Sequence, residues 1–388
     1  MAGTTTNFAI PYPSSTDYVT DGATAMRSIA DQVDAVLFTG SSSGNLLING
    51  AMQVSQRSAV GTAVTGITTT GYNTADRWVS QIGTMGTWTQ TTVADAPTGS
   101  GFRNSLKLAC TTADASPAAG DFCTVTQKIE GQNLQAIRKG TASAQTLTLS
   151  FWVKAFQTGT FIVELRDEDN TRICCKAYTI SVSNTWEYKT ILFPADTTGA
   201  FDNDNNGSLT VNWWLGAGSS YTSGTLQTTW AASVDINRAV GVTNLASSTS
   251  NTFFLTGTQL TVGSVATPFE FKSFADYLQD CQRYFQQSRN TNMPPVGYSP
   301  TGCSVITAFS AYNPLGYSNT EFAVPMRAAP TITMWSTGGT LNRANVVGIG
   351  DYVISTPEAT ERGIHRVGCT GWSASMSGEF LWQALAEL

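Results

Sequence analysis

The sequence predicts a mainly β protein: a jelly-roll β-sandwich plus a smaller C-terminal β-sandwich domain, with one short N-terminal helix and one inter-domain helix. From residue 45 to 271, roughly ten short runs such as LTLSFWVKAF (147–156) alternate apolar and polar residues, as half-buried strands do. Turn-forming residues separate these runs, and no helical period intervenes. At 388 residues, the chain is also longer than one ordinary domain.

The composition excludes several partners and compartments. Charged residues are only 12% of the chain, and the net charge is −6 without any Lys/Arg cluster, so no nucleic-acid partner is expected. No run approaches the ~18 apolar residues of a membrane span, so no membrane insertion is expected. The N-terminal residues MAGTTTNFAIPYPSS lack the features of a secretory signal, which predicts folding in a cytoplasm. The seven cysteines, irregularly spaced and without a CxxC pair, are predicted to be reduced core residues.

Residues 1–44 form the first predicted region, with a helix at 21–38 after a proline-containing extended stretch. Apolar side chains at heptad spacing line one face of this helix: Met26, Ile29, Val33 and Val36. Two heptads are too few for a stable isolated coiled coil. The helix therefore either docks on its own domain, or joins a short three-helix bundle or grips another protein as an anchor.

The remaining regions are 45–272, predicted as the jelly roll, 273–289 as a connecting helix, and 290–388 as a distal β domain. SFADYLQDCQRYFQQS (273–288) begins with Ser273 and Asp276 in a capping-box-like arrangement. Its apolar residues fall on one helical face, which predicts that the helix covers a sheet edge or an inter-domain seam.

Three blocks of the sequence resemble landmarks of tail-fibre and receptor-binding proteins of tailed bacteriophages. They are DYVTDGATAMRSIADQVD (17–34), LLINGAMQVSQRS (46–58) with TADRW (74–78) and the later GTQLTVGSVATPFEFKSFADYLQDCQRYFQ (257–286), and FAVPMRAAPTIT (322–333). The second block resembles a carbohydrate-binding-module-like jelly roll of such proteins. The resemblance implies a location on the virion and a role in host attachment, and it transfers neither a receptor nor a catalytic residue.

On this basis we expect three partners: further copies of the chain in a homotrimer, a tail or adaptor protein contacted by residues 1–44, and a host-surface glycan. A homotrimer would hide strand edges that otherwise invite aggregation. A purely structural tail or collar component and a glycan depolymerase are the alternatives. The chain has one histidine, His365, which no GxSxG elbow accompanies, and its clustered carboxylates at 166–172 are typical of a hairpin tip. We therefore expect no enzymatic activity and no cofactor.

One segment offers a possible structural Ca²⁺ site. In DNDNNG (202–207), Asp202, Asp204 and Asn206 alternate before a glycine, as in the first half of a calcium loop. Trp213 stands where such a loop needs a bidentate Glu, so an ordinary Asp/Asn/Gly turn is the alternative interpretation.

Glycan binding would require exposed aromatic rings beside neutral hydrogen-bonding groups. Trp213 and Trp214 are adjacent on a predicted strand, so one faces the core and the other faces outward or a subunit contact. The candidate receptor residues are Trp214, Tyr221, Tyr298, Tyr312, Tyr317 and Trp372. We expect the receptor surface in the loops of residues 290–388, remote from the N-terminal attachment segment.

Overall fold

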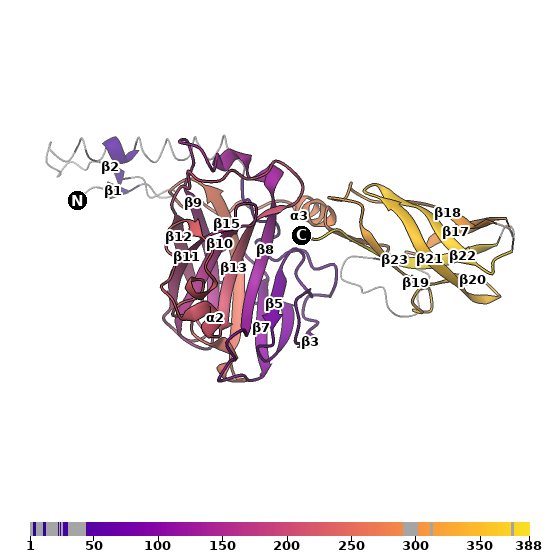
Figure 1. Cartoon of the computed structure of the whole chain (residues 1–388), viewed down its shortest axis with the longest axis horizontal. Helices are drawn as coiled ribbons and strands as arrows, with labels where there is room; N and C mark the ends of the chain where they lie inside the picture. The colour runs from indigo at the N-terminus through magenta and orange to yellow at the C-terminus, as the bar shows by residue number, and fades with distance from the viewer. Residues whose placement is uncertain are drawn as a thin grey trace.

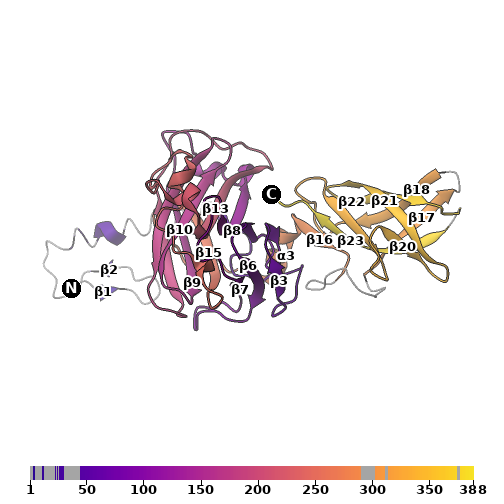
Figure 2. The same ribbon diagram turned by 60° about the horizontal axis from the view of Figure 1, so that its bottom comes forward.

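A computed structural model describes residues 3–4, 11–12, 22, 24, 26–29, 44–289, 302–310, 313–373 and 376–388. It confirms a mainly β protein with few helices. Two β units lie side by side, the larger formed by stacked sheets and the smaller by the C-terminal strands (Figures 1 and 2). None of the described helices is long and apolar enough to cross a membrane.

The larger unit is a sandwich of two antiparallel sheets. One sheet has seven strands in the order β14-β11-β10-β13-β8-β5-β4. They are β14 (Ala231–Ala232), β11 (Arg172–Ile180), β10 (Gly159–Asp167), β13 (Gly207–Ala217), β8 (Phe122–Glu130), β5 (Val79–Gly83) and β4 (Gly71–Tyr72). The other sheet has six strands in the order β12-β9-β15-β7-β6-β3. They are β12 (Glu187–Phe193), β9 (Leu147–Ala155), β15 (Thr252–Val262), β7 (Ser105–Thr112), β6 (Thr87–Val93) and β3 (Val64–Ile67).

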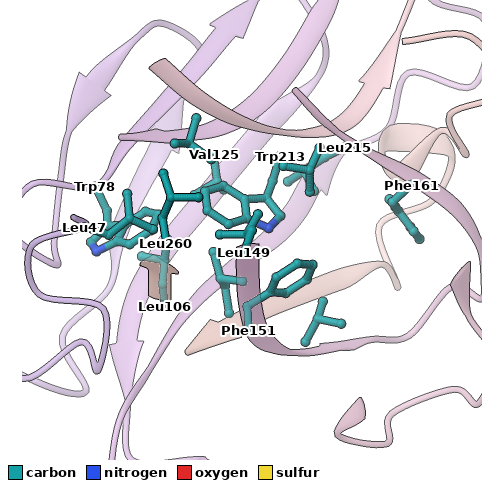
Figure 3. Close-up of a cluster of buried hydrophobic side chains, with 14 of the residues drawn as sticks. Leu47, Trp78, Leu106, Val125, Leu149, Phe151, Phe161, Trp213, Leu215 and Leu260 are labelled. Carbon is teal, nitrogen blue, oxygen red and sulfur yellow. The ribbon is translucent and has the colours of Figure 1, made fainter. Parts of the chain in front are cut away.

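The core lies between these sheets and follows the predicted alternation. On β9, Phe151 and Val153 are fully buried in the core, while the intervening Trp152 is only half-buried and faces outward. Figure 3 shows Trp78, Phe151 and Trp213 converging at the centre, where Trp213 lies 5.5 Å from the ring centroid of Trp78 and 5.7 Å from that of Phe151. Aromatic packing of this kind makes a large contribution to stability, because each ring buries ~150–250 Å².

The cysteines are free, as predicted, and all but Cys303 are buried. Cys174 belongs to the core between the sheets, and its neighbour Cys175 packs in a second apolar cluster on the outer side of the seven-stranded sheet. Adjacent strand residues therefore face opposite sides, and burial raises the pKa of both thiols.

Short helical turns connect the strands of the sandwich. They are η1 (Gly131–Asn133), η2 (Gln135–Ile137), α2 (Ser219–Thr222), η3 (Asp235–Asn237) and η4 (Leu245–Ser247). At the N-terminus, β1 (Gly3–Thr4) pairs with β2 (Pro11–Tyr12), and residues 22, 24 and 26–29 are helical. Met26 is 66% exposed and Ile29 is half-buried. Val33 and Val36 lie outside the described residues, so the bundle or anchor role of this helix stays a prediction.

The connecting helix α3 (Phe274–Gln282) begins where the sequence predicts, with the Ser273 hydroxyl accepting a hydrogen bond from the backbone N–H of Asp276 at 3.2 Å. It is shorter than the predicted segment 273–289. After Arg283 the chain turns into β16 (Phe285–Gln287), which pairs with the last strand of the distal unit. The ladder hydrogen bonds to that strand replace those of a further helical turn, an outcome that the local sequence pattern cannot reveal.

The distal unit is one sheet that closes on itself. Its strands are β16, β17 (Ser304–Ser310), β18 (Asn313–Glu321), β19 (Thr331–Ser336), β20 (Arg343–Val346), β21 (Gly350–Thr360), β22 (Gly363–Thr370) and β23 (Ser377–Leu385). The order is β16-β23-β17-β18-β22-β21-β20, β19 pairs with β23, and β20 pairs with both β21 and β23. A separate core fills it, with Ile306, Ile354 and Phe380 fully buried.

The chain ends at the boundary between the two units (Figure 1). Here Arg57 of the sandwich contacts Asp76 at 3.0 Å and Glu387 at 2.9 Å, and its guanidinium lies 3.8 Å from the ring centroid of Phe285. The fully buried Arg77 donates to the carboxylate of Glu387 and, at 2.7 Å, to the carbonyl of Lys128. The residues that follow β23 thus bring a carboxylate to two sandwich arginines.

A second ion pair crosses the same boundary. Glu130 at the end of β8 accepts hydrogen bonds at 2.7 Å from both Nε and Nη2 of Arg283, and another from the hydroxyl of Tyr284. Burial alone would raise the pKa of Glu130, but these hydrogen bonds outweigh it and hold the pKa below its ordinary value.

We call Arg57, Asp76, Arg77, Glu130, Arg283 and Glu387 the charged junction. Separating the two units would leave buried charges without partners.

Candidate functional site

The outer face of the six-stranded sheet carries a group of aromatic side chains that are partly exposed, except for the buried Phe254. We call it the aromatic platform and define it as Phe102, Trp152, Trp186, Tyr188, Phe254 and Phe271. Its members come from three neighbouring strands, β12, β9 and β15, and from the loops beside them. The positions of Tyr188, Trp152 and Phe254 follow from the alternation of their strands, because the residues between outward-facing positions face the core.

The platform begins at the edge strand β12. Tyr188 pairs in register with Trp152 on β9, and their ring centroids are 5.3 Å apart. Tyr188 is 47% exposed, and Trp152 is half-buried. A directly opposed aromatic pair on neighbouring strands stabilises a sheet. Here it also leaves ring surface open to solvent.

A glycine lets the aromatic surface continue across β15. Gly257 lies at a bulge with φ of +59°, and a Cβ there would come within 2.7 Å of Phe102 and 3.0 Å of Trp152. Phe102 in turn lies 5.1 Å from Phe271, which is 53% exposed. Because no side chain intervenes at Gly257, aromatic rings extend from β12 to the segment that precedes α3.

Two lysines lie on either side of Phe254 within the platform. The ammonium of Lys154 lies 4.3 Å from the ring centroid of Phe254 and 2.5 Å from the carboxylate of Asp95, which also accepts a hydrogen bond from the indole of Trp186 at 3.1 Å. The ammonium of Lys107 lies 5.4 Å from the same ring centroid. Lys107 forms no ion pair with any residue that the structure describes.

This arrangement suits a ligand with flat apolar faces and polar edges. A contiguous exposed apolar surface on a folded protein commonly marks an interaction site. Sugar rings present apolar C–H faces that stack on aromatic rings and hydroxyls that form hydrogen bonds with polar neighbours. The platform combines extended aromatic surface with lysine ammoniums and the carboxylate of Asp95, and it can therefore bind a saccharide chain.

Two residues predicted for receptor binding, Trp214 and Tyr221, do lie together, with ring centroids 5.3 Å apart on the outer side of the seven-stranded sheet. Trp214 faces away from the main core, as predicted, but it is only 2% exposed. Residues 218–242 pack over it, and its indole N–H donates to Glu164, which also binds Arg238. This burial corrects the expectation of an exposed ring.

The cavity beside Trp214 is also small. It has a volume of about 70 Å³ and is lined by Gln81, Phe122, Thr124, Asn212, Trp214, Tyr221 and Arg238. A water molecule in the liquid occupies ~30 Å³. The cavity therefore has room for a few small atoms and not for a sugar ring.

The other predicted receptor residues lie in the distal unit. Tyr298 and Tyr312 are outside the described residues. Trp372 is 5% exposed and donates its indole N–H to the carbonyl of Val353, so the expectation of an exposed ring is corrected here too. Tyr317 is 55% exposed, with the guanidinium of Arg366 5.7 Å from its ring centroid.

The possible calcium segment lies between β12 and β13. The carboxylate of Asp204 accepts a hydrogen bond from the backbone N–H of Asn206 at 2.9 Å, and the backbone N–H of Asp202 donates to Asp169 at 2.9 Å. The first of these contacts is that of an Asx turn, and the second joins the segment to the turn that follows β10. Within the described residues, no group of three or more His, Cys, Asp or Glu side chains is placed to hold a metal ion.

Sequence reasoning missed the platform, although part of the signal is present. Trp152 alternates with the apolar Phe151 and Val153, so an aromatic residue occupies a position that the pattern assigns to the outer face. Phe102 and Phe271 gave no such signal, because both lie in loops whose path depends on the tertiary fold.

No protein-family model and no curated protein matches the chain. Among solved structures, the enzymatically active domain of tailspike protein 4 of bacteriophage CBA120 is similar with a TM-score of 0.28 and 14% identity; the match covers 56% of this chain and 21% of the tailspike chain. TmCBM61, solved with β-1,4-galactotriose, has a TM-score of 0.28 and 10% identity, covering 57% and 99% of the two chains. The CBM22-1 xylan-binding domain of Xyn10C from Paenibacillus barcinonensis has a TM-score of 0.27 and 11% identity, covering 58% and 99%. These likenesses are distant, so the proposals below rest on the residues of this chain.

Proposed function

We propose that the chain is a carbohydrate-binding subunit of a bacteriophage tail fibre, which attaches the particle to a host-surface glycan without cleaving it. The observation that carries the proposal is the aromatic platform, with Tyr188 and Phe271 exposed at its two ends. The sequence resemblance to tail-fibre proteins supplies the setting on the virion. The glycan lies across the sheet, its sugar rings stacked on Trp152 and its neighbours.

Attachment by such a surface depends on several copies. A shallow, open platform gives modest affinity for one glycan chain, and linked copies raise the overall affinity by about 10²–10⁴ without new contacts. A homotrimer held to a tail or adaptor protein through residues 1–44 would supply these copies.

Two carboxylates of the sandwich form ion pairs inside the protein, which favours glycan binding over glycan cleavage. Glycoside hydrolysis needs two carboxyl groups that face the scissile bond. In the sandwich, Glu164 is fully buried and bound to Arg238 at 2.7 Å, and Asp167 is fully buried and bound to Lys139 at 2.5 Å. Both groups neutralise a cation inside the protein, where a glycan does not reach.

A purely structural tail or collar subunit is the second candidate function. It is favoured by exposed apolar side chains outside the platform, namely Leu192 on β12 at 47% and Phe156 just after β9 at 44% exposed. In that case a neighbouring subunit, and not a glycan, would cover the aromatic rings.

The test is binding of full-length protein to purified host capsular and lipopolysaccharide preparations in affinity electrophoresis, alongside a reducing-end assay for cleavage. The expected result is retardation by at least one polysaccharide without release of reducing ends, and loss of retardation in the Trp152→Ala/Tyr188→Ala double variant. Tyr317→Ala is the matched control and should bind normally. Light scattering on the same samples reports copy number. A platform variant that binds glycans normally but loses its oligomeric state would favour the structural subunit.

A further inference from the structure

We infer that the platform binds an acidic polysaccharide, one whose sugar carboxylate pairs with Lys107. The inference rests on the proposed glycan-binding function and names the ligand class. It is carried by the position and the missing partner of a single lysine.

Lys107 lies on the outer face of β7, inside the row of side chains that contains the platform. In register it stands between Phe254 on β15 and Thr91 on β6. Its side chain is half-buried, and its ammonium lies 5.4 Å from the ring centroid of Phe254. Because no carboxylate of the described residues pairs with this ammonium, an anion from outside the chain can form an ion pair with it.

Lys154 provides the internal comparison. It lies across the same ring of Phe254, yet its ammonium is neutralised by the carboxylate of Asp95 at 2.5 Å. Of the two lysines that flank Phe254, one is therefore paired within the chain and the other is not. The platform keeps a positive charge at Lys107, beside the ring of Phe254.

This charge distinguishes between ligand classes. A neutral glycan can accept a hydrogen bond from the ammonium of Lys107, but it leaves the positive charge of that ammonium uncompensated. A glycan with a carboxylate on the sugar ring accepts the same hydrogen bond and adds the attraction between opposite charges. Charge complementarity thus favours uronic-acid-type polymers over neutral polymers of the same backbone.

The experiment compares each polymer with its own neutral form. Polygalacturonate, alginate and hyaluronate are each tested beside their carboxyl-reduced derivatives, in which CH₂OH replaces the carboxylate, by calorimetry or affinity electrophoresis of full-length protein. We expect at least one acidic polymer to bind about tenfold or more tightly than its reduced form. Raising the salt concentration should narrow this difference.

Variants at position 107 assign the preference to this lysine. Lys107→Met keeps the apolar stem, removes the charge and should abolish the preference for the acidic form, while Lys107→Arg should retain it. Lys176→Met is the matched control, because Lys176 is a half-buried lysine of the seven-stranded sheet and should leave the preference unchanged. Thermal melting of each variant separates a loss of binding from a loss of folding, and Lys107→Gln replaces Lys107→Met if the latter does not fold.

Three outcomes would overturn the inference. Equal or tighter binding of the carboxyl-reduced polymers means that the ligand is neutral, and it leaves the proposed glycan-binding function standing. Failure of every polymer in both forms, with binding also absent for the host polysaccharides, overturns the proposed function as well. Concentration-dependent self-association that disappears in both Lys107→Met and Trp152→Ala assigns the platform to a second copy of the chain.

Discussion

At the charged junction the buried charges are paired within the chain, whereas at the aromatic platform one lysine has no carboxylate partner among the described residues. At the junction, Arg77 and Glu130 are fully buried, and each has a partner on the other side of the boundary between the units. At the platform, Lys107 is half-buried beside an aromatic ring and has no carboxylate partner among the described residues. A region that holds a structure together satisfies its charges internally, whereas a region that binds a ligand leaves a charge for that ligand to satisfy.

The largest effect is expected at the junction. Arg77→Met leaves the buried carboxylate of Glu387 with Arg57 as its remaining ion-pair partner. The free energy of unfolding should fall by about 3–5 kcal/mol, because a buried charge that loses an ion-pair partner is no longer compensated for the loss of its hydration. Urea denaturation measures this loss. Arg103→Met, an exposed position, is the control and should change the free energy by less than about 0.5 kcal/mol.

A double variant sharpens the same point. Arg77→Met combined with Glu387→Gln should cost less than the sum of the two single changes, because the second substitution removes the charge that the first left unpaired. Simple additivity would show that the two side chains act independently and that the junction is not a coupled network.

The next effect is expected on binding at the platform. Trp152→Ala removes the central ring and should weaken glycan binding by about 2 kcal/mol or more, as for aromatic anchors in other interfaces. The free energy of unfolding should fall less than for a buried tryptophan, because Trp152 is half-exposed. Calorimetric titration and urea denaturation of the same protein give both numbers. A stability loss as large as that of Trp213→Ala, without a binding defect, would make Trp152 a core residue.

A smaller effect is expected at Gly257. Gly257→Ala combines an unfavourable positive φ with a Cβ that meets Phe102 and Trp152, and it should lower the free energy of unfolding by about 1–2 kcal/mol and weaken glycan binding. Gly241→Ala is the matched control, since Gly241 also has a positive φ, of +84°, but nothing within 4 Å of the added Cβ. Equal binding by both variants would contradict a role for Gly257 in shaping the platform.

The smallest effect is expected from pH. The pKa of Glu130 is held below its ordinary value of 4.5, so its stabilising contribution is fully present above that value and is lost as the pH falls through the lower pKa of the folded state. Stability measured between pH 7 and ~3 should therefore decline in acid, and less steeply in Glu130→Gln. Equal slopes for the two proteins would remove Glu130 from the acid-sensitive groups.

The sequence could predict features that depend on local periodicity. Alternation along β9 puts Phe151 and Trp152 on opposite faces, and alternation along β13 does the same for Trp213 and Trp214, of which Trp213 is the one in the main core. The hydroxyl at Ser273 marked the start of α3. Each of these depends on a side-chain spacing that is fixed by the geometry of one element.

Features that depend on distant segments escaped prediction. Trp214 was expected to face outward, but its burial depends on residues 218–242 folding back over the sheet. The junction joins Arg77 to a carboxylate 310 residues later in the sequence. The platform likewise needs Phe102, Gly257 and Phe271 to meet across separate loops and strands. Such encounters are set by tertiary packing, which periodicity does not encode.

The most direct test of the central claim is hydroxyl-radical footprinting of the full-length protein with and without a bound polysaccharide, read out residue by residue by mass spectrometry. If the platform is the glycan-binding surface, bound glycan protects Tyr188, Trp152 and Phe271 from oxidation and leaves the exposed Tyr317 of the distal unit unchanged. Protection of Tyr317 with unaltered oxidation of Tyr188 would contradict the claim and move the receptor surface to the distal unit.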